Sequence, residues 1–188
     1  MPSDLSRQVI RVGFSALYAR KFYFLLALCI LLVDQFTKSW AVSALSYAQP
    51  LPFVPFFQFT LLHNEGAAFG FLSQAGGWQR WVLGAVAFGV SAFLVVWMTR
   101  IAAAQRCELL GLSCILGGAI GNLWDRMALG YVVYFIDWYY PHTHCLPFFY
   151  ARIEAQTCHW PAFNIADAAI LMGVGLLMID MFCVKRES

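Results

Sequence analysis

The sequence predicts an all-α membrane protein, a four-helix transmembrane bundle with a small β-cradle on one side of the membrane. Of its 188 residues, 61% are hydrophobic and only 12% are charged, with a mean hydropathy of +0.67. Soluble domains are roughly 45–50% apolar. Four apolar segments approach the roughly 20 residues that a helix needs to cross a bilayer: about 22–45, 81–98, 109–129 and 163–184. We expect residues 1–188 to form a single integral membrane domain.

The basic residues predict the orientation of this bundle. They precede the first apolar segment, separate the second from the third, and follow the fourth: Arg7, Arg11, Arg20, Lys21, Arg100, Arg106, Lys185 and Arg186. By the positive-inside rule these stretches face the cytoplasm. Both termini are therefore expected to be cytoplasmic, and connections 46–80 and 127–162 to lie on the outer side. A net charge of +2 without a basic stripe argues against a nucleic-acid partner.

The first apolar segment is interpreted as an uncleaved signal anchor. Asp34 and Lys38 interrupt the apolar core that a removable signal peptide would need. Their i, i+4 spacing with the acid first is the favourable order for an ion pair within a helix. We therefore expect Asp34 and Lys38 to be a structural polar pair.

The first outer connection is predicted to contain short strands within 51–62, because it is aromatic, partly β-branched and bounded by prolines. A turn at 64–70 follows. There, Asn64 offers an amide to an extended peptide, and Gly66 lets another backbone approach closely. The simpler alternative is a turn that only leads into the next helix.

The second outer connection, 130–161, is unusually long for a compact membrane domain. It contains His142, His144, Cys145, Cys158 and His159. Cys145 and Cys158 could form a disulfide in an oxidising compartment, the cysteines and histidines could bind zinc, or neither could occur. The sequence leaves these three alternatives open.

Two polar groups lie at the ends of the third and fourth apolar segments. Asn122, Asp125 and Arg126 share one helix face by their spacing, and Asn164 and Asp167 are three apart. Two such helix ends at one depth could assemble a polar site. The alternative is a buried hydrogen-bond network in which Arg126 neutralises Asp125. Asp167 has no basic neighbour in sequence, so it is the better catalytic candidate.

Carboxylates are the chemical resource that the sequence offers. A serine nucleophile elbow, a zinc-binding His-Glu-x-x-His helix, a phosphate loop and a dinucleotide fingerprint are all missing from it. Two carboxylates that share a proton can activate a water and protonate a carbonyl oxygen, which is aspartic peptidase chemistry.

Five motifs occur in order between residues 31 and 178: Val33-Asp34-Gln35-Phe36-Thr37-Lys38, Asn64-Glu65-Gly66-Ala67-Ala68-Phe69, Gly117-Gly118-Ala119-Ile120-Gly121-Asn122-Leu123-Trp124-Asp125-Arg126, Gly130-Tyr131-Val132-Val133 and Phe163-Asn164-Ile165-Ala166-Asp167. Together they resemble the lipoprotein signal peptidase family, also called signal peptidase II. The resemblance implies a multi-pass aspartic endopeptidase of the bacterial inner membrane, inhibited by globomycin. Such enzymes remove signal peptides from prolipoproteins by cutting before a diacylglyceryl-modified cysteine, and the resemblance implies that they use no metal and no cofactor.

The resemblance also implies roles for individual residues. Asp167 matches one of two catalytic aspartates, at a site on the periplasmic face beside the β-cradle. Residues matching the lining or support of the site are Asn64, Gly66, Asn122, Asp125, Arg126, Asn164 and Ala166. The implied partners are prolipoproteins carrying diacylglyceryl-cysteine and membrane lipid, and the chain is expected to be a monomer.

The second catalytic aspartate is where the chain departs from the family pattern. The family has Asp after Val-Val, whereas this sequence has Tyr134. A phenol with a reference pKa near 10 cannot be a general base at neutral pH, and its ring would fill space needed for water and the scissile bond. We therefore expect greatly reduced peptidase activity. Asp137 could stand in only if this segment is helical, because in a strand it points away from Tyr134.

Two other functions are compatible with the sequence. The same groove could belong to a non-catalytic binder of lipidated precursors or signal helices. Alternatively, Asp34, Asp125 and Asp167 could be the relay of a small proton-coupled transporter. The acids cluster toward one face and the predicted helices are few, which argues against a transporter.

Overall fold

The structure, a computed structural model, describes residues 4–66, 77–142, 144–152 and 156–184. Within these ranges it contains four helices and one five-stranded antiparallel sheet. The helices are α1 (Asp4–Ala44), α2 (Gln79–Arg100), α3 (Arg106–Ala128) and α4 (Ile165–Val184). The strands are β1 (Pro50–Val54), β2 (Phe57–Asn64), β3 (Val132–Pro141), β4 (Tyr150–Arg152) and β5 (Thr157–His159).

All four of these helices are long and apolar enough to cross a membrane, which confirms the predicted bundle. Their membrane-length portions are Arg20–Ala44, Gln79–Arg100, Arg106–Ala128 and Ile165–Phe182. The predicted boundaries differ from these by only a few residues. The first helix also extends back to Asp4, because the polar segment before the span contains no helix-breaking proline after residue 2.

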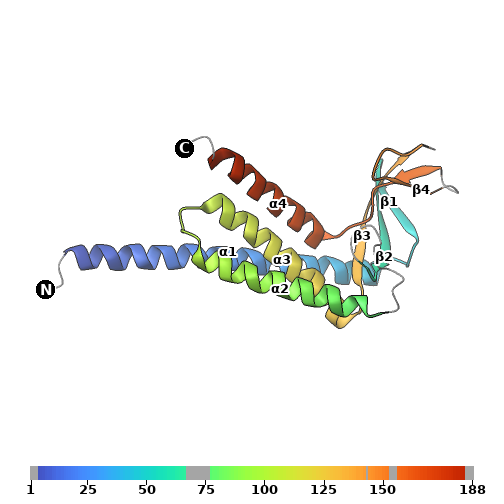
Figure 1. Ribbon diagram of the computed structural model, residues 1–188. Coiled ribbons are helices and arrows are strands. Elements are labelled where there is room, and N and C mark those ends of the chain that lie inside the picture. The colour runs from blue at the N-terminus through green and yellow to red at the C-terminus, as the bar shows by residue number, and fades with distance from the viewer. Residues whose placement is uncertain (1–3, 67–76, 143, 153–155, 185–188) are drawn as a thin grey trace.

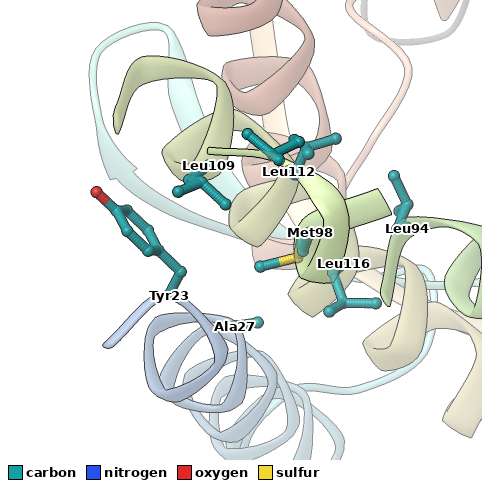
Figure 2. Packing of buried hydrophobic residues seen from close by; sticks show 8 residues of the cluster. Tyr23, Ala27, Leu94, Met98, Leu109, Leu112 and Leu116 are labelled. Carbon is teal, nitrogen blue, oxygen red and sulfur yellow. The ribbon is translucent and has the colours of Figure 1, made fainter. Parts of the chain in front are cut away.

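Helix α3 is the centre of the bundle and packs against α1, α2 and α4 (Figure 1). The sheet lies at one end of the helices, and the start of α1 and the end of α4 lie at the other (Figure 1). Apolar side chains of α1, α2 and α3 form a core toward this second end (Figure 2): Tyr23, Ala27, Leu94, Met98, Leu109, Leu112 and Leu116. The outward faces of the helices carry exposed large apolar side chains such as Phe88 and Leu171, as lipid-facing surfaces do.

Glycines of α3 allow its neighbours to approach closely. A Cβ added at Gly117 would lie 2.6 Å from the backbone oxygen of Ala27 in α1, and one added at Gly118 would collide with the backbone oxygen of Ala166 in α4. In membranes, where lipid is as apolar as a side chain, such small-residue contacts are a main source of helix association. They bring the N-terminal end of α4 directly against α3.

The sheet has the strand order β1-β2-β3-β5-β4. Strands β1 and β2 confirm the strands predicted within 51–62. Leu61 of β2 and Val133 and Phe135 of β3 pack against Ala41 and Leu45 at the end of α1. This packing seats the sheet on the bundle. Strands β3, β4 and β5 come from the second outer connection, where the sequence analysis predicted none.

Cys145 and Cys158 form a disulfide. Of the three alternatives left open by the sequence, the disulfide is the one observed, so zinc binding by these two thiols is wrong. The turn predicted at 64–70 begins as expected, because the backbone N–H of Gly66 donates to Asn64 Oδ1 at 2.9 Å. Residues 67–70 lie outside the described residues.

We predict that Gly118→Val destabilises the bundle by about 3 kcal/mol or more, because overpacking a tight contact forces backbone shifts. The measurement is thermal unfolding of the purified chain in detergent. Gly175→Val is the matched control, since a Cβ at Gly175 in α4 meets no atom within 4 Å. Equal stability of the two variants would contradict close packing at Gly118.

Candidate active site

A buried ion network joins α1 to α3 beneath the sheet. Lys38 Nζ lies 2.7 Å from Asp34 Oδ2 and 2.9 Å from Asp125 Oδ2, and all three side chains are at most 3% exposed. The predicted Asp34–Lys38 pair is therefore confirmed. The alternative of a buried hydrogen-bond network had Arg126 pairing with Asp125. In the structure the ion pair of Asp125 is instead with Lys38 of α1.

Both carboxylates also accept hydrogen bonds from other residues. Asp34 Oδ1 accepts from the backbone N–H of Ala166 at the start of α4 (2.9 Å). Asp125 Oδ2 accepts from the backbone N–H of Val133 in β3 (3.1 Å), and Asp125 Oδ1 accepts from Gln35 Nε2 (2.9 Å). Buried charges persist when they are paired and hydrogen-bonded in this way. The network thus fixes α1, α3, α4 and β3 relative to one another.

Gln35 received no role from the sequence. Its amide donates to Asp125 and also to the backbone oxygen of Gly121 at 3.1 Å. The available signal was its position, since it directly follows Asp34 within an otherwise apolar span. A polar side chain at such a position has to find an internal partner.

Asp167 is positioned by a reciprocal cap at the N-terminus of α4. The Asp167 N–H donates to Asn164 Oδ1 (2.9 Å), and the Asn164 N–H donates to Asp167 Oδ2 (3.2 Å). This is the arrangement of a capping box, with Asn and Asp in place of Ser and Glu. The positive end of the helix dipole favours a carboxylate here. The N-x-x-D spacing noted in the sequence thus has a direct structural cause.

Asn122 and Asn164 connect this cap to α3. Asn122 Nδ2 donates to Asp167 Oδ1 at 2.8 Å. Asn122 Oδ1 accepts from Asn164 Nδ2 and from Lys38 Nζ, each at 3.0 Å. Asn164 Nδ2 also donates to the backbone oxygen of Val133. The structure therefore brings together the two polar helix ends that the sequence pointed to.

Tyr134 projects from β3 beside this cluster. Its Oη accepts a hydrogen bond of 2.7 Å from Asn64 Nδ2. Burial, reinforced by the negative charge of Asp167, raises the pKa of Tyr134 to about 12. The side chain is therefore a neutral phenol at any physiological pH.

Arg126 holds the end of β2 against α3. Its Nη2 donates to the backbone oxygen of Gly66 at 3.2 Å, and its Nη1 donates to the backbone oxygen of Asn122 at 3.4 Å. Asn64, which bonds Tyr134, is two residues before Gly66. The guanidinium thereby supports the position of the Asn64 amide.

Asp137 lies on the other face of β3 from Tyr134, because residues 132–141 form a strand. The helical geometry that would place Asp137 on the same face as Tyr134 is therefore not present. Its carboxylate is fully buried and accepts from Gln58 Nε2 (2.7 Å) and Thr60 Oγ1 (2.8 Å). It also pairs with His159 Nδ1 at 2.7 Å. Asp137 therefore links β2, β3 and β5.

Tyr134 and Asp167 line two different cavities. The larger, of about 600 Å³, lies on the sheet side and is lined by Asn64, Tyr134 and Phe148, among others. The smaller, of about 380 Å³, runs along α4 and is lined by Asp167, Leu171 and further apolar residues. Among the described residues, no three His, Cys, Asp or Glu side chains gather as they would around a metal ion.

Together the fold and site define a multi-pass membrane protein whose polar centre lies where the helix bundle meets a sheet. The sequence profile described as signal peptidase (SPase) II matches residues 26–183. The lipoprotein signal peptidase of Cellvibrio japonicus is 45% identical over 161 residues, which covers 86% of each chain. That of Teredinibacter turnerae is 47% identical over 154 residues and covers 82% of this chain and 83% of its own.

Solved structures agree with these relatives. A bacterial membrane enzyme determined by the in meso method at 2.3 Å resolution matches with a TM-score of 0.72 and 25% identity, over 89% of this chain and 92% of its own. The chain belongs to the lipoprotein signal peptidase family. This confirms the resemblance found in the sequence, and with it the membrane protease class.

We predict that Asn122→Leu destabilises the chain by about 2 kcal/mol or more, because it leaves buried partners on Lys38, Asn164 and Asp167 unsatisfied. Unfolding in detergent measures the effect. Ser113→Ala is the control on the same helix, since Ser113 is fully buried but donates to Leu109 O of its own helix. A loss no larger than that of the control would show that the Asn122 bonds carry little stability.

Proposed function

We propose that this lipoprotein signal peptidase binds diacylglyceryl-modified prolipoproteins between Tyr134 and Asp167, but cleaves them poorly because Tyr134 stands at the second catalytic aspartate. The observation that carries the proposal is the placement of Tyr134. Its phenol sits beside a cluster in which Asn64, Asn122 and Asn164 are all engaged, and its neighbour Asp167 is a capped carboxylate.

The chemistry explains the expected loss. In an aspartic peptidase, one carboxylate takes a proton from water as the oxygen attacks the scissile carbonyl, while a carboxylic acid protonates the carbonyl oxygen. Asp167 can supply one of these groups. A neutral phenol can donate a hydrogen bond to the developing oxyanion. At neutral pH it cannot serve as the base that takes the proton from water, so it cannot alternate with Asp167 between acid and base.

The remaining residues are proposed to bind and position the substrate. Asn64 and Arg126 support the outer side of the site, and both are hydrogen-bonded to the backbone of Gly66. Lys38 holds Asn122 in position by a hydrogen bond, and Asp34 holds the backbone of Ala166 in the same way. None of these roles requires a metal or a cofactor.

The orientation follows from two features. Arg20 begins the membrane-length part of α1, Arg100 ends α2 and Arg106 begins α3, and these ends lie opposite the sheet. The positive-inside rule assigns that side to the cytoplasm. The sheet carries a disulfide, which is typical of an oxidising compartment such as the periplasm. We therefore place the site at the periplasmic face of the bacterial inner membrane, with both termini cytoplasmic, in a monomer that is one integral membrane domain.

The second candidate function is a non-catalytic binder of lipidated precursors or signal helices. Tyr134 also favours this candidate. The polar contacts around position 134, such as the Asn64–Tyr134 hydrogen bond, are present although the residue there is not an acid. A proton relay is not proposed, because Asp34 and Asp125 share one ammonium in a single cluster at one depth.

We predict that Tyr134→Asp raises cleavage of a diacylglyceryl-modified prolipoprotein by at least about 100-fold, the low end of what a positioned acid–base group contributes. Mass spectrometry of the released signal peptide measures it. Tyr134→Phe is the control that removes the hydroxyl without adding an acid, and it should stay near the parent. Asp167→Asn combined with Tyr134→Asp should abolish the gain.

Equal cleavage by the parent and by Tyr134→Asp would refute the assignment of position 134 to the second catalytic aspartate. Binding without cleavage by Tyr134→Asp would favour the non-catalytic binder.

We predict that residual cleavage by the parent chain does not climb between pH 6 and pH 9. The phenol of Tyr134, with a pKa of about 12, stays protonated throughout this window. If Tyr134 acted as a base, its ionised fraction and the rate would rise about tenfold per pH unit. A pH profile of signal-peptide release distinguishes the two.

A further inference from the structure

Part of the second outer connection forms a wall beside the site. We call residues 144–152 and 156–159 the outer hairpin, which contains β4 and β5. The Cys145–Cys158 disulfide closes it, and pairing of β5 with β3 attaches it to the sheet. The buried Asp137–His159 pair adds a side-chain link to β3. The outer hairpin is therefore held in place independently of any ligand.

A cavity of about 600 Å³ separates this wall from the site, within the size range of ligand pockets. Phe148, Phe149 and Tyr150 of the outer hairpin line one side, and Asn64 and Tyr134 line the other. The hairpin side is thus aromatic, while Asn64 and Tyr134 present polar groups from the side of the site. Such a surface suits a peptide with apolar side chains turned toward the hairpin.

Phe148 and Phe149 contribute differently to the wall. Phe149 packs edge-on against Tyr140 and Trp160, with ring centroids 5.2 and 5.4 Å away. Phe148 is 74% exposed, and its backbone has a φ of +71°. A bulky residue rarely adopts this left-handed conformation. Phe148 therefore presents an apolar ring at the cavity without serving the internal packing of the chain.

The positions of the two cavities define the direction in which a bound substrate chain would run. Asp167 lines the groove along the membrane helix α4, whereas Tyr134 lines the cavity under the outer hairpin. A chain that passes between these two residues has its signal helix on the α4 side. The residues after its lipidated cysteine then enter the outer cavity.

We propose that the outer hairpin is a specificity element that binds the first residues after the lipidated cysteine, and that Phe148 selects apolar side chains among them. This inference rests on the proposed function. The occupant is an extended peptide segment of the substrate. Side chains after the cysteine, and not the acyl chains on it, set the preference.

The test compares two diacylglyceryl-modified prolipoproteins with the same signal sequence and cysteine. In one the next three residues are Leu-Phe-Leu, and in the other they are Gly-Ser-Gly. Dissociation constants are measured for the full chain in phospholipid nanodiscs. We expect the parent chain to bind the apolar substrate at least about fivefold more tightly, as burial of apolar side chains predicts.

Phe148→Ser is expected to reduce this preference to below about twofold while leaving binding of the Gly-Ser-Gly substrate unchanged. Leu146→Ser is the matched control, because Leu146 is 62% exposed on the same hairpin but does not line the cavity. It should keep the preference of the parent chain. Both positions are exposed, so neither change should disturb folding.

Three results would overturn the proposal. If Phe148→Ser changes neither dissociation constant, the preference does not come from Phe148. The proposed specificity element is then refuted, and the proposed function still stands. Equal weakening of both substrates by Phe148→Ser would assign the cavity to the shared lipid. If neither substrate binds the parent chain, the proposed function fails and this inference fails with it.

Discussion

One ammonium group placed between two buried carboxylates organises this protein. Lys38 forms ion pairs with Asp34 on its own helix and with Asp125 on α3, in a region where an unpaired charge is expensive. The two carboxylates also accept hydrogen bonds from the backbone N–H groups of Ala166 and Val133. The same ions therefore hold the first turn of α4 and the beginning of β3 in place. Glycines such as Gly118 let the helices come close enough for these bonds. The geometry around Asp167 is therefore a consequence of charge pairing in an apolar surrounding.

This organisation explains why a tyrosine at position 134 is compatible with the family fold. The Lys38 network is built from residues of α1, α3, α4 and β3, and the side chain of Tyr134 lies outside it, bonded to Asn64. Replacing an aspartate at 134 changes the chemistry without removing a member of that network. Under the proposed function, binding and catalysis are therefore separable in this chain, and the outer hairpin contributes to binding.

The sequence predicted the bundle well because length and hydropathy decide which segments cross a membrane, and it predicted the Asp34–Lys38 pair because both residues lie on one helix. It could not predict contacts set by the packing of distant segments. Asp125 binds Lys38 instead of the adjacent Arg126, and Gln35 reaches across to Asp125. The strands at 132–159 escaped prediction because their pairing is long-range and two of them have three residues each. The role of Asp137 depended on whether its segment was a strand, which the sequence left open.

The most direct test of this account is a double-mutant cycle on Lys38→Met and Asp125→Asn, measured as free energies of unfolding in detergent. If Lys38 binds Asp125 across the helix interface, the double variant should lose less stability than the two single variants together, with a coupling energy of at least about 1 kcal/mol. Effects that add to within about 0.5 kcal/mol would mean that the two residues act independently. That result would contradict the central role given to the Lys38 network.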